Sequence, residues 1–179
     1  EAGTNREMEW IDSLFGDILP PRRVCHPPLG ATICSPAAAL RGLTEMMMDT
    51  MAEPQLLHRL MGFLRDAVLR GMDYVEGAGL LTPNNNGPML CSEPIGVAPA
   101  DGRLRCGNLW GHGNSQEFDQ IPPRLWEEFL FNYQRPILAR YGLVSYGCCE
   151  NLTQKIDTVL TLPNLRVFVC SAWTDLGVV

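Results

Sequence analysis

The 179-residue sequence has a single lysine, Lys155, and its 20 acidic residues outnumber its 14 basic residues, which gives a net charge of −6. A nucleic-acid-binding protein normally carries a basic stripe, so this balance argues against a nucleic-acid partner. No run of about 18 apolar residues occurs, so no membrane-spanning helix is expected. No charged start followed by an apolar stretch and a small-residue cleavage site occurs, so no signal peptide is predicted.

No CxxC pair occurs among the seven cysteines, which argues against a zinc ribbon or a thioredoxin-like redox site. Their odd number and irregular spacing also differ from a small secreted disulfide scaffold, and this favours a reducing, cytoplasmic location. Most are expected to behave as inert, small apolar side chains. These are Cys34, Cys91, Cys106 and Cys170.

Several well-known catalytic motifs are also missing: the phosphate loop, GxGxxG, HExxH and a Ser-His-Asp order. What is present is 46% hydrophobic residues, enough for a core. The chain begins at Glu1 without a methionine and stops at Val179 just after an apolar stretch. We therefore expect it to be a piece of a longer protein.

The first half predicts helices after an irregular start. Residues 1–15 have a weak helical pattern and residues 20–28 are rich in turn formers, so residues 1–35 are predicted to be an N-terminal irregular segment. Ser35 and Pro36 are typical of a helix start, and Pro54 begins a second helix. The predicted apolar stripes are Leu40, Leu43, Met47 and Met51 in the first helix, and Leu56, Leu60, Phe63, Ala67 and Gly71 in the second.

The second half alternates between helix and strand. Pro122 and Pro123 open a predicted helix that Pro136 should kink or break and Gly142 should end. Strand 143–146, a helix around 152–162 and strand 166–170 follow, whereas residues 78–116 read as strand ends and long loops. This alternation predicts an α/β fold with parallel strands, either an open sheet or a closed barrel. Chemistry collects where the strands of such folds end.

The first candidate site is residues 147–150, which follow the predicted strand 143–146. We expect this segment to enter a helix, where the positive end of the dipole makes a thiol easier to deprotonate. Cys148 or Cys149 could then bind zinc, attack an electrophile or contact a substrate, and Glu150 could act as a ligand or an acid–base group. A buried thiol in a strand-to-helix turn is the structural alternative.

Two further segments carry candidate substrate-binding residues. Residues 110–116 form a glycine-rich stretch, predicted as a loop, that contains His112, Asn114 and Gln116. At the end of the last predicted strand, Asp175 follows Trp173 and could bind a substrate through its carboxylate. The alternative for both segments is a loop whose polar groups satisfy their own backbone.

Three ordered blocks of the sequence resemble the uroporphyrinogen decarboxylase-like superfamily. They are residues 40–64, with the pattern D-x-x-x-x-P, residues 110–138, and residues 146–175, which read YGCCENLTQKIDTVLTLPNLRVFVCSAWTD. The resemblance covers about 140 residues and implies that residues 36–179 form roughly half of a (β/α)8 TIM barrel. Such a piece needs a partner to cover its strand edges, either the remainder of its own barrel or a second copy.

The resemblance also implies two chemistries: cofactor-independent decarboxylation of uroporphyrinogen, and methyl transfer between a corrinoid and a thiol that zinc activates. The methyltransferases carry a His-x-Cys-Gly zinc motif at this strand end. Laid over it, Cys149 takes the cysteine position and Gly147 the histidine position, so the ligand set departs from the family pattern. Cys148, Glu150 or His112 could supply the missing ligand, and the third ligand would lie beyond Val179.

We expect methyl transfer, with Cys149, Glu150 and Tyr146 as catalytic residues and Cys149 and Cys148 as metal ligands. Zinc is the candidate metal, and a corrinoid, free or on a corrinoid protein, is the candidate co-substrate. Uroporphyrinogen decarboxylation, as in porphyrin biosynthesis, and a non-catalytic tetrapyrrole-binding role are the alternatives.

Overall fold

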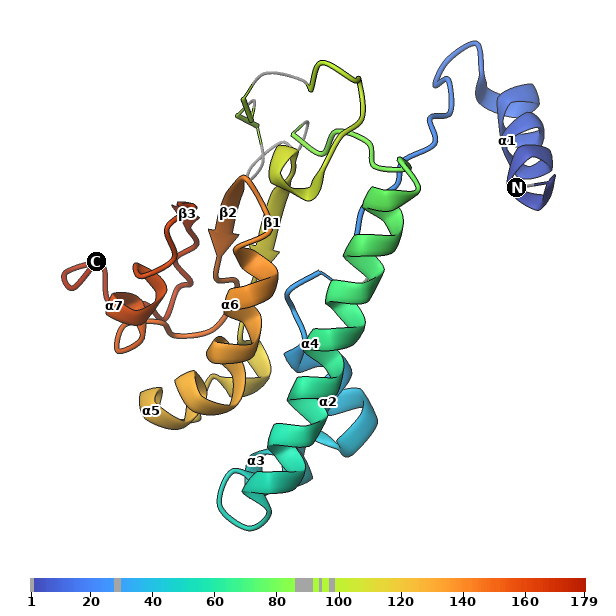
Figure 1. Cartoon of the computed structure of the whole chain (residues 1–179). Helices are drawn as coiled ribbons and strands as arrows, with labels where there is room; N and C mark the ends of the chain where they lie inside the picture. The colour runs from blue at the N-terminus through green and yellow to red at the C-terminus, as the bar shows by residue number, and fades with distance from the viewer. Residues whose placement is uncertain (1, 28–29, 86–91, 94, 97–98) are drawn as a thin grey trace.

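The computed structural model describes residues 2–27, 30–85, 92–93, 95–96 and 99–179. Within them, three parallel strands form a sheet in the order β1-β2-β3 (Figure 1). The strands are β1 (Trp110–Gly113), β2 (Leu143–Tyr146) and β3 (Leu165–Phe168). Parallel strands joined through helices confirm the α/β class. Three strands do not close a barrel, so the half-barrel stays a prediction.

The central strand β2 has a neighbour on each side, and three of its four residues are buried. Val144, Ser145 and Tyr146 are all inaccessible to solvent. Its register pairs Gly113 with Tyr146 on one side and Tyr146 with Phe168 on the other, with an irregularity between Val144 and Ser145. The predicted strands at 143–146 and 166–170 are thus confirmed to within two residues.

Segment 110–113 was predicted to be a loop, and this prediction is wrong. Trp110–Gly113 is strand β1 and pairs with β2 along its whole length. Glycine has a low strand propensity, so the two glycines of this segment did not indicate a strand. The fold nevertheless requires them. A Cβ atom on Gly111 would lie 2.5 Å from the Tyr141 ring, and one on Gly113 would lie 2.9 Å from the Tyr146 ring. The glycines therefore let aromatic side chains pack directly on the strand.

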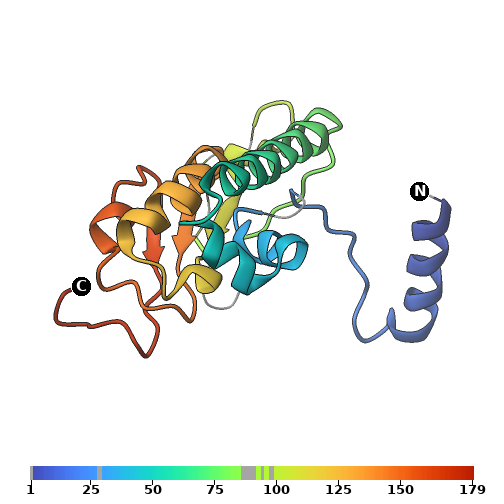
Figure 2. The ribbon, with the colours of Figure 1, turned by 90° about the horizontal axis from the view of Figure 1, so that it is seen from below.

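Helices cover one face of the sheet (Figures 1 and 2). One helical stretch runs from α5 (Pro123–Trp126) through a π-helical segment, Glu127–Phe131, to α6 (Asn132–Leu138). The long helix α4 (Pro54–Gly77) packs beside α6. Between the first stretch and the sheet, the Trp126 ring stacks on Phe131 at 4.8 Å and meets Tyr146 edge-on at 6.4 Å.

The helix after Pro122 was predicted to kink or break at Pro136, but α6 continues through this residue, and the irregularity is instead the π-helical segment upstream. Pro136 lies inside α6 and has no N–H to donate to the preceding turn, so the ladder there is already interrupted. The widened turn at 127–131 lies just before it. The helix ends at Leu138, four residues before Gly142, so the predicted cap at Gly142 is wrong.

The helix predicted from Ser35 is divided in two, α2 (Cys34–Arg41) and α3 (Leu43–Asp49). Gly42 separates them with a φ of +92°, a conformation that favours glycine. The break changes the phase of the helix, so the predicted apolar stripe is wrong. Leu40 and Met51 are 66% and 77% exposed, whereas Ala37 and Met46 are fully buried.

The stripe predicted for the second helix is also displaced, by about one position. Phe63 is 60% exposed. The buried residues of α4 are Leu57, Met61, Leu64, Val68, Met72 and Val75. Both sets recur at spacings of three and four, so periodicity alone does not choose between them, and packing against α6 decides.

The N-terminal residues are more ordered than the predicted irregular segment. Helix α1 (Ala2–Phe15) stands apart from the rest of the chain in both views (Figures 1 and 2). Ala31 and Ile33 are fully buried in the core, so the proposed boundary at residue 35 cuts through packed residues. The helix predicted around 152–162 is also shorter, since α7 covers only Ile156–Val159. Among the described residues, no helix combines the length and apolar content needed to cross a membrane.

Candidate functional site at the carboxyl edge of the sheet

The segments after β1, β2 and β3 meet at one edge of the sheet, because the strands are parallel. The Gly147 N–H donates to the Gly113 carbonyl at 2.9 Å, and the Val169 N–H donates to the Tyr146 carbonyl at 2.8 Å. Gly147 has a φ of +112°, and a Cβ there would lie 2.5 Å from the Val169 carbonyl oxygen. The predicted site segments around His112 and Cys149 therefore leave adjacent strands at the same edge.

Glu150 joins two of these segments through a buried carboxylate. It is 2% exposed. One carboxylate oxygen accepts hydrogen bonds from the Ser115 N–H at 2.6 Å and the Ser115 hydroxyl at 3.1 Å, and the other accepts from the Cys148 N–H at 3.0 Å. With both oxygens used in this way, Glu150 fixes the turn that presents the two cysteines. Its geometry favours a positioning role over direct contact with a substrate.

The two cysteines do not lie at a helix N-terminus, so that prediction is wrong. Residues 147–155 form bends and turns, and the four-residue helix α7 begins only at Ile156. The helix dipole therefore does not act on these thiols. For Cys148, partial burial raises the pKa of the thiol, and hydrogen bonding and repulsion from Cys149 and Glu150 raise it further. Cys148 is thus held as a neutral thiol.

Zinc does not fit the described residues on their own. The Cys148 and Cys149 sulfurs lie 3.6 Å apart, but no group of three His, Cys, Asp or Glu side chains suited to a metal ion exists in the described part of the chain. Both Glu150 oxygens already accept hydrogen bonds from backbone N–H groups. A structural or catalytic zinc needs at least three protein ligands. Zinc binding by Cys148 and Cys149 stays a prediction that requires a ligand from elsewhere.

Exposure differs among the described cysteines, and this predicts their reactivity. Cys149 and Cys170 are exposed, Cys34 and Cys106 are buried, and Cys25 and Cys148 are intermediate. The expectation of a buried, inert thiol is therefore wrong for Cys170, and Cys91 lies outside the described residues. Burial, together with the neighbouring Glu76 carboxylate, raises the pKa of Cys106 to about 12, and burial raises that of Cys34 still further. We expect iodoacetamide at pH 8 to modify the exposed pair at least about tenfold faster than the buried pair.

Peptide mass spectrometry of the native chain measures these rates, and the same reaction in 6 M guanidinium is the control. All four thiols should react at similar rates once the chain is unfolded. Native labelling of Cys34 as fast as that of Cys149 would contradict the burial on which the prediction rests.

Tyr146 lies in the core and not at the open edge. Its hydroxyl donates to the Gln134 side-chain oxygen at 2.8 Å, and burial raises its pKa well above the usual value. The Gln134 amide in turn donates to the Asn114 and Ala31 carbonyls at 2.8 and 2.7 Å. This network ties the segment after β1 to helix α6 and to the N-terminal segment. Tyr146 therefore has a positioning role. Asn114 belongs to the same network through its backbone carbonyl.

Sequence reasoning missed Gln134. It is fully buried on a helix whose other inward residues are apolar. A polar residue on the apolar face of a predicted helix was the signal that could have found it, since a buried amide requires hydrogen-bond partners.

His112 projects from β1 beside β2. Its Nδ1 lies 2.9 Å from the Ser145 hydroxyl, with which it is paired in the strand register. Partial burial lowers the pKa of the imidazole, although the Glu150 charge opposes this shift. His112 is therefore neutral at pH 7 and able to accept or donate a hydrogen bond. This is compatible with the predicted substrate-binding role.

The segments after all three strands line a cavity of about 520 Å³. The predicted substrate-binding residues Trp173 and Asp175 both line it. Gln116, in the short helix Gln116–Phe118, is exposed but does not line it. Sequence reasoning missed Asp119 and Lys155, which line the same cavity. A single lysine in a chain whose other basic residues are arginines was the available signal.

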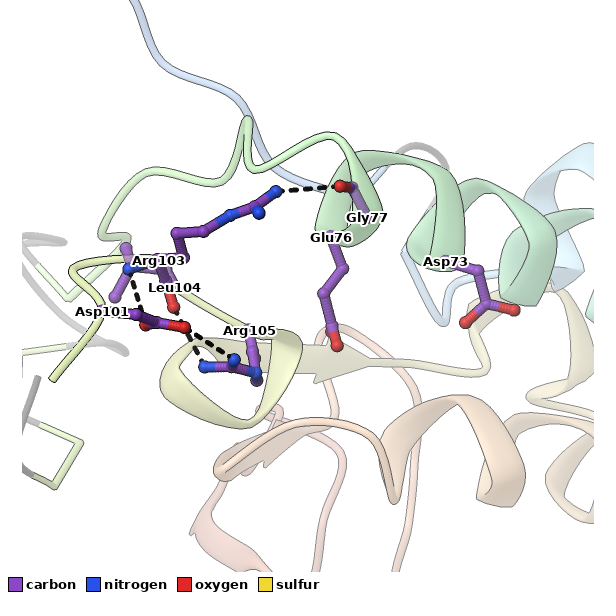
Figure 3. A pocket seen from close by; sticks show the side chains of 7 residues that line it. All are labelled: Asp73, Glu76, Gly77, Asp101, Arg103, Leu104 and Arg105. Atoms are coloured by element: carbon purple, nitrogen blue, oxygen red, sulfur yellow. Dashed lines mark hydrogen bonds and ion pairs between the residues drawn. The ribbon is translucent and has the colours of Figure 1, made fainter. Parts of the chain in front are cut away.

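A second cavity, of about 320 Å³, lies near the amino end of β1 (Figure 3). Its arginines already have partners: Arg105 forms an ion pair with Asp101 at 2.9 Å, and Arg103 donates to the Gly77 backbone carbonyl at 2.9 Å. Glu76 accepts the Cys106 N–H at 2.8 Å. Since these groups satisfy each other, the cavity is explained as an ion-pair cluster that holds the end of α4.

Comparison of the chain with protein-family models, with curated proteins and with solved structures gave no significant match.

Proposed function

We propose that this chain is part of a methyl-transferring enzyme of the uroporphyrinogen decarboxylase-like type, in which Cys149 contacts the substrate. The observation that carries the proposal is the position of Cys149. It is an exposed thiol that follows the central strand of a parallel sheet, on a turn fixed by the buried Glu150 carboxylate. Open α/β sheets and barrels bind their ligands at this edge.

The thiol is the chemically suited group for this reaction. In the proposed transfer, the bond from the methyl group to cobalt, nitrogen or oxygen breaks, and that atom keeps the bonding electron pair. The methyl group forms a new bond to the sulfur of a thiol, whose proton passes to a base or to water. A thiolate is a strong nucleophile even without a metal. His112 is half-buried at the same edge of the sheet, and we propose that it accepts a proton or orients the substrate.

Two features support the finer parts of the proposal. All six cysteines in the described ranges are free thiols, as in a protein of the reducing cytoplasm. The three strands and their covering helices are compatible with part of a TIM barrel, in which the remainder of the barrel or a second copy covers the outer strands. On these grounds we propose a cytoplasmic location and a partial TIM barrel.

The test is methyl transfer from methylcobalamin to a thiol, followed by the loss of the cobalt–carbon absorbance and by product mass. We expect Cys149→Ala to lower the rate at least about a hundredfold, as is typical when a nucleophile is removed. Cys170→Ala is the matched control, since Cys170 is another exposed thiol after a strand, and it should retain the rate. Equal rates in the two variants would rule out the proposed role of Cys149.

Elemental analysis of the same purified protein tests the metal separately. Stoichiometric zinc that is lost in Cys149→Ala and kept in Cys170→Ala would show that Cys149 is a ligand. Activity of the zinc-free protein would show that the thiol reacts without a metal.

A further inference from the structure

We propose that the 520 Å³ cavity at the carboxyl edge binds a small organic ammonium ion. Its wall is built from the segments after β1, β2 and β3, and two carboxylates and one tryptophan are its functional groups. The claim that this cation is the methylated substrate of the reaction rests on the proposed function. The claim that the cavity binds it rests on the geometry alone.

The loops around the cavity are fixed to one another. Asp119, after β1, accepts the Asn151 N–H at 2.6 Å, which binds the first loop to the second. The Asp175 N–H donates to the Thr153 hydroxyl at 2.8 Å, which binds the third loop to the second. These hydrogen bonds hold the three loops of the wall together without a ligand.

The charge that the cavity presents to a ligand is negative. Lys155 is the one cationic side chain that the described residues place in its wall. It is 3% exposed, and its ammonium donates to the Phe118 and Asp119 carbonyls at 2.9 and 3.1 Å. It also lies 5.6 Å from the Trp126 ring. This ammonium faces the backbone and the core. The carboxylates of Asp119 and Asp175 are left as the charges that a ligand meets.

Each carboxylate keeps capacity for a ligand. One oxygen of Asp175 accepts the Gly177 N–H at 2.8 Å, and the other has no partner among the described residues. Asp119 uses its oxygens for the Asn151 N–H and the Gln120 amide, and each oxygen retains a second lone pair. The site thus presents acceptors and negative charge to an incoming group.

Trp173 adds the specificity for an organic cation. Its side chain is 73% exposed, and within the described chain it makes no ring contact or hydrogen bond. Only its backbone is fixed, by a 3.1 Å hydrogen bond to the Ser171 hydroxyl. An indole face beside a carboxylate attracts alkylated ammonium ions through cation–π and charge interactions. A metal ion or an inorganic anion would not use the indole.

The experiment compares choline with 3,3-dimethylbutan-1-ol, an uncharged molecule of the same shape, by calorimetry or NMR titration of the whole chain. We expect choline to bind about tenfold more tightly at low salt, and this preference should shrink in 0.5 M NaCl. Trp173→Leu and Asp175→Asn should each weaken choline binding by about fivefold or more.

Matched controls are Trp10→Leu and Asp157→Asn, which remove an exposed tryptophan and an exposed carboxylate elsewhere, and both should bind choline normally. Equal binding of the two probes, or choline binding that Trp173→Leu leaves unchanged, would overturn the inference. Choline binding is measured on the wild-type chain, and methyl transfer is measured as the difference in rate between the wild type and Cys149→Ala. Binding without Cys149-dependent methyl transfer would therefore remove the proposed function alone, and transfer without choline binding would remove this inference alone.

Discussion

Trp126→Ala should destabilise the chain by about 3–5 kcal/mol, the usual cost of truncating a fully buried tryptophan. Trp126 has no exposed surface and contacts both the helical layer and the sheet, through Phe131 and Tyr146. It also lies below the Lys155 ammonium. Its removal therefore opens a cavity between the layers and takes away a cation–π contact beneath the candidate site.

Urea denaturation followed by circular dichroism measures this loss. Trp126→Phe retains an aromatic ring at the same position and should cost only about 1–2 kcal/mol, since less of the space is left empty. Trp10→Ala, on the exposed helix α1, should have almost no effect. A small loss in Trp126→Ala would show that the layers do not pack as described.

Glu150→Ala should cost about 3 kcal/mol, the second-largest effect that we expect. The change leaves the Ser115 N–H, the Ser115 hydroxyl and the Cys148 N–H without their acceptor in a buried place. Each unsatisfied buried donor costs about 1–3 kcal/mol, and local relaxation with entry of water offsets part of the sum. We also expect methyl transfer to fall, because the turn that carries Cys149 loses its anchor.

Glu150→Gln separates hydrogen bonding from packing. Its amide oxygen can still accept from Ser115, but its NH2 group would face the Cys148 N–H, so donor meets donor. The free energy of unfolding of Glu150→Gln should lie between those of the wild type and Glu150→Ala. Glu9→Ala, which removes an exposed carboxylate on α1, is the control for charge. If Glu150→Gln and Glu150→Ala are equally stable, the Ser115 bonds do not contribute as argued.

The sequence predicted the α/β class and two of the three strands because their signals are local. Leu143–Tyr146 and Leu165–Phe168 are short apolar runs that follow helical patterns. Strand β1 was missed because Gly111 and Gly113 have low strand propensity, and their purpose depends on rings that come 30 and 33 residues later.

The candidate site shows the same division. The placement of Cys149 and Asp175 at one edge followed from the expectation of parallel strands. The placement of His112 beside them did not, because strand β1 was missed. The roles of Glu150 and Tyr146 did not follow, because burial and hydrogen-bond partners decide them. Gln134 binds Tyr146 from 12 residues away in the sequence, and Ser115 binds Glu150 from 35 residues away. A linear pattern does not contain such pairings.

The cavity at the carboxyl edge draws most of its wall from loops, whereas the folding core lies beneath the sheet. Trp173 and Asp175 can therefore vary with little cost to folding, so ligand preference and thermodynamic stability are open to separate selection. Lys155 is the exception, because it lines the cavity while its ammonium binds the Phe118 and Asp119 carbonyls. Directed evolution of this chain toward new ligands should accordingly accept changes at Trp173 readily and reject most changes at Lys155.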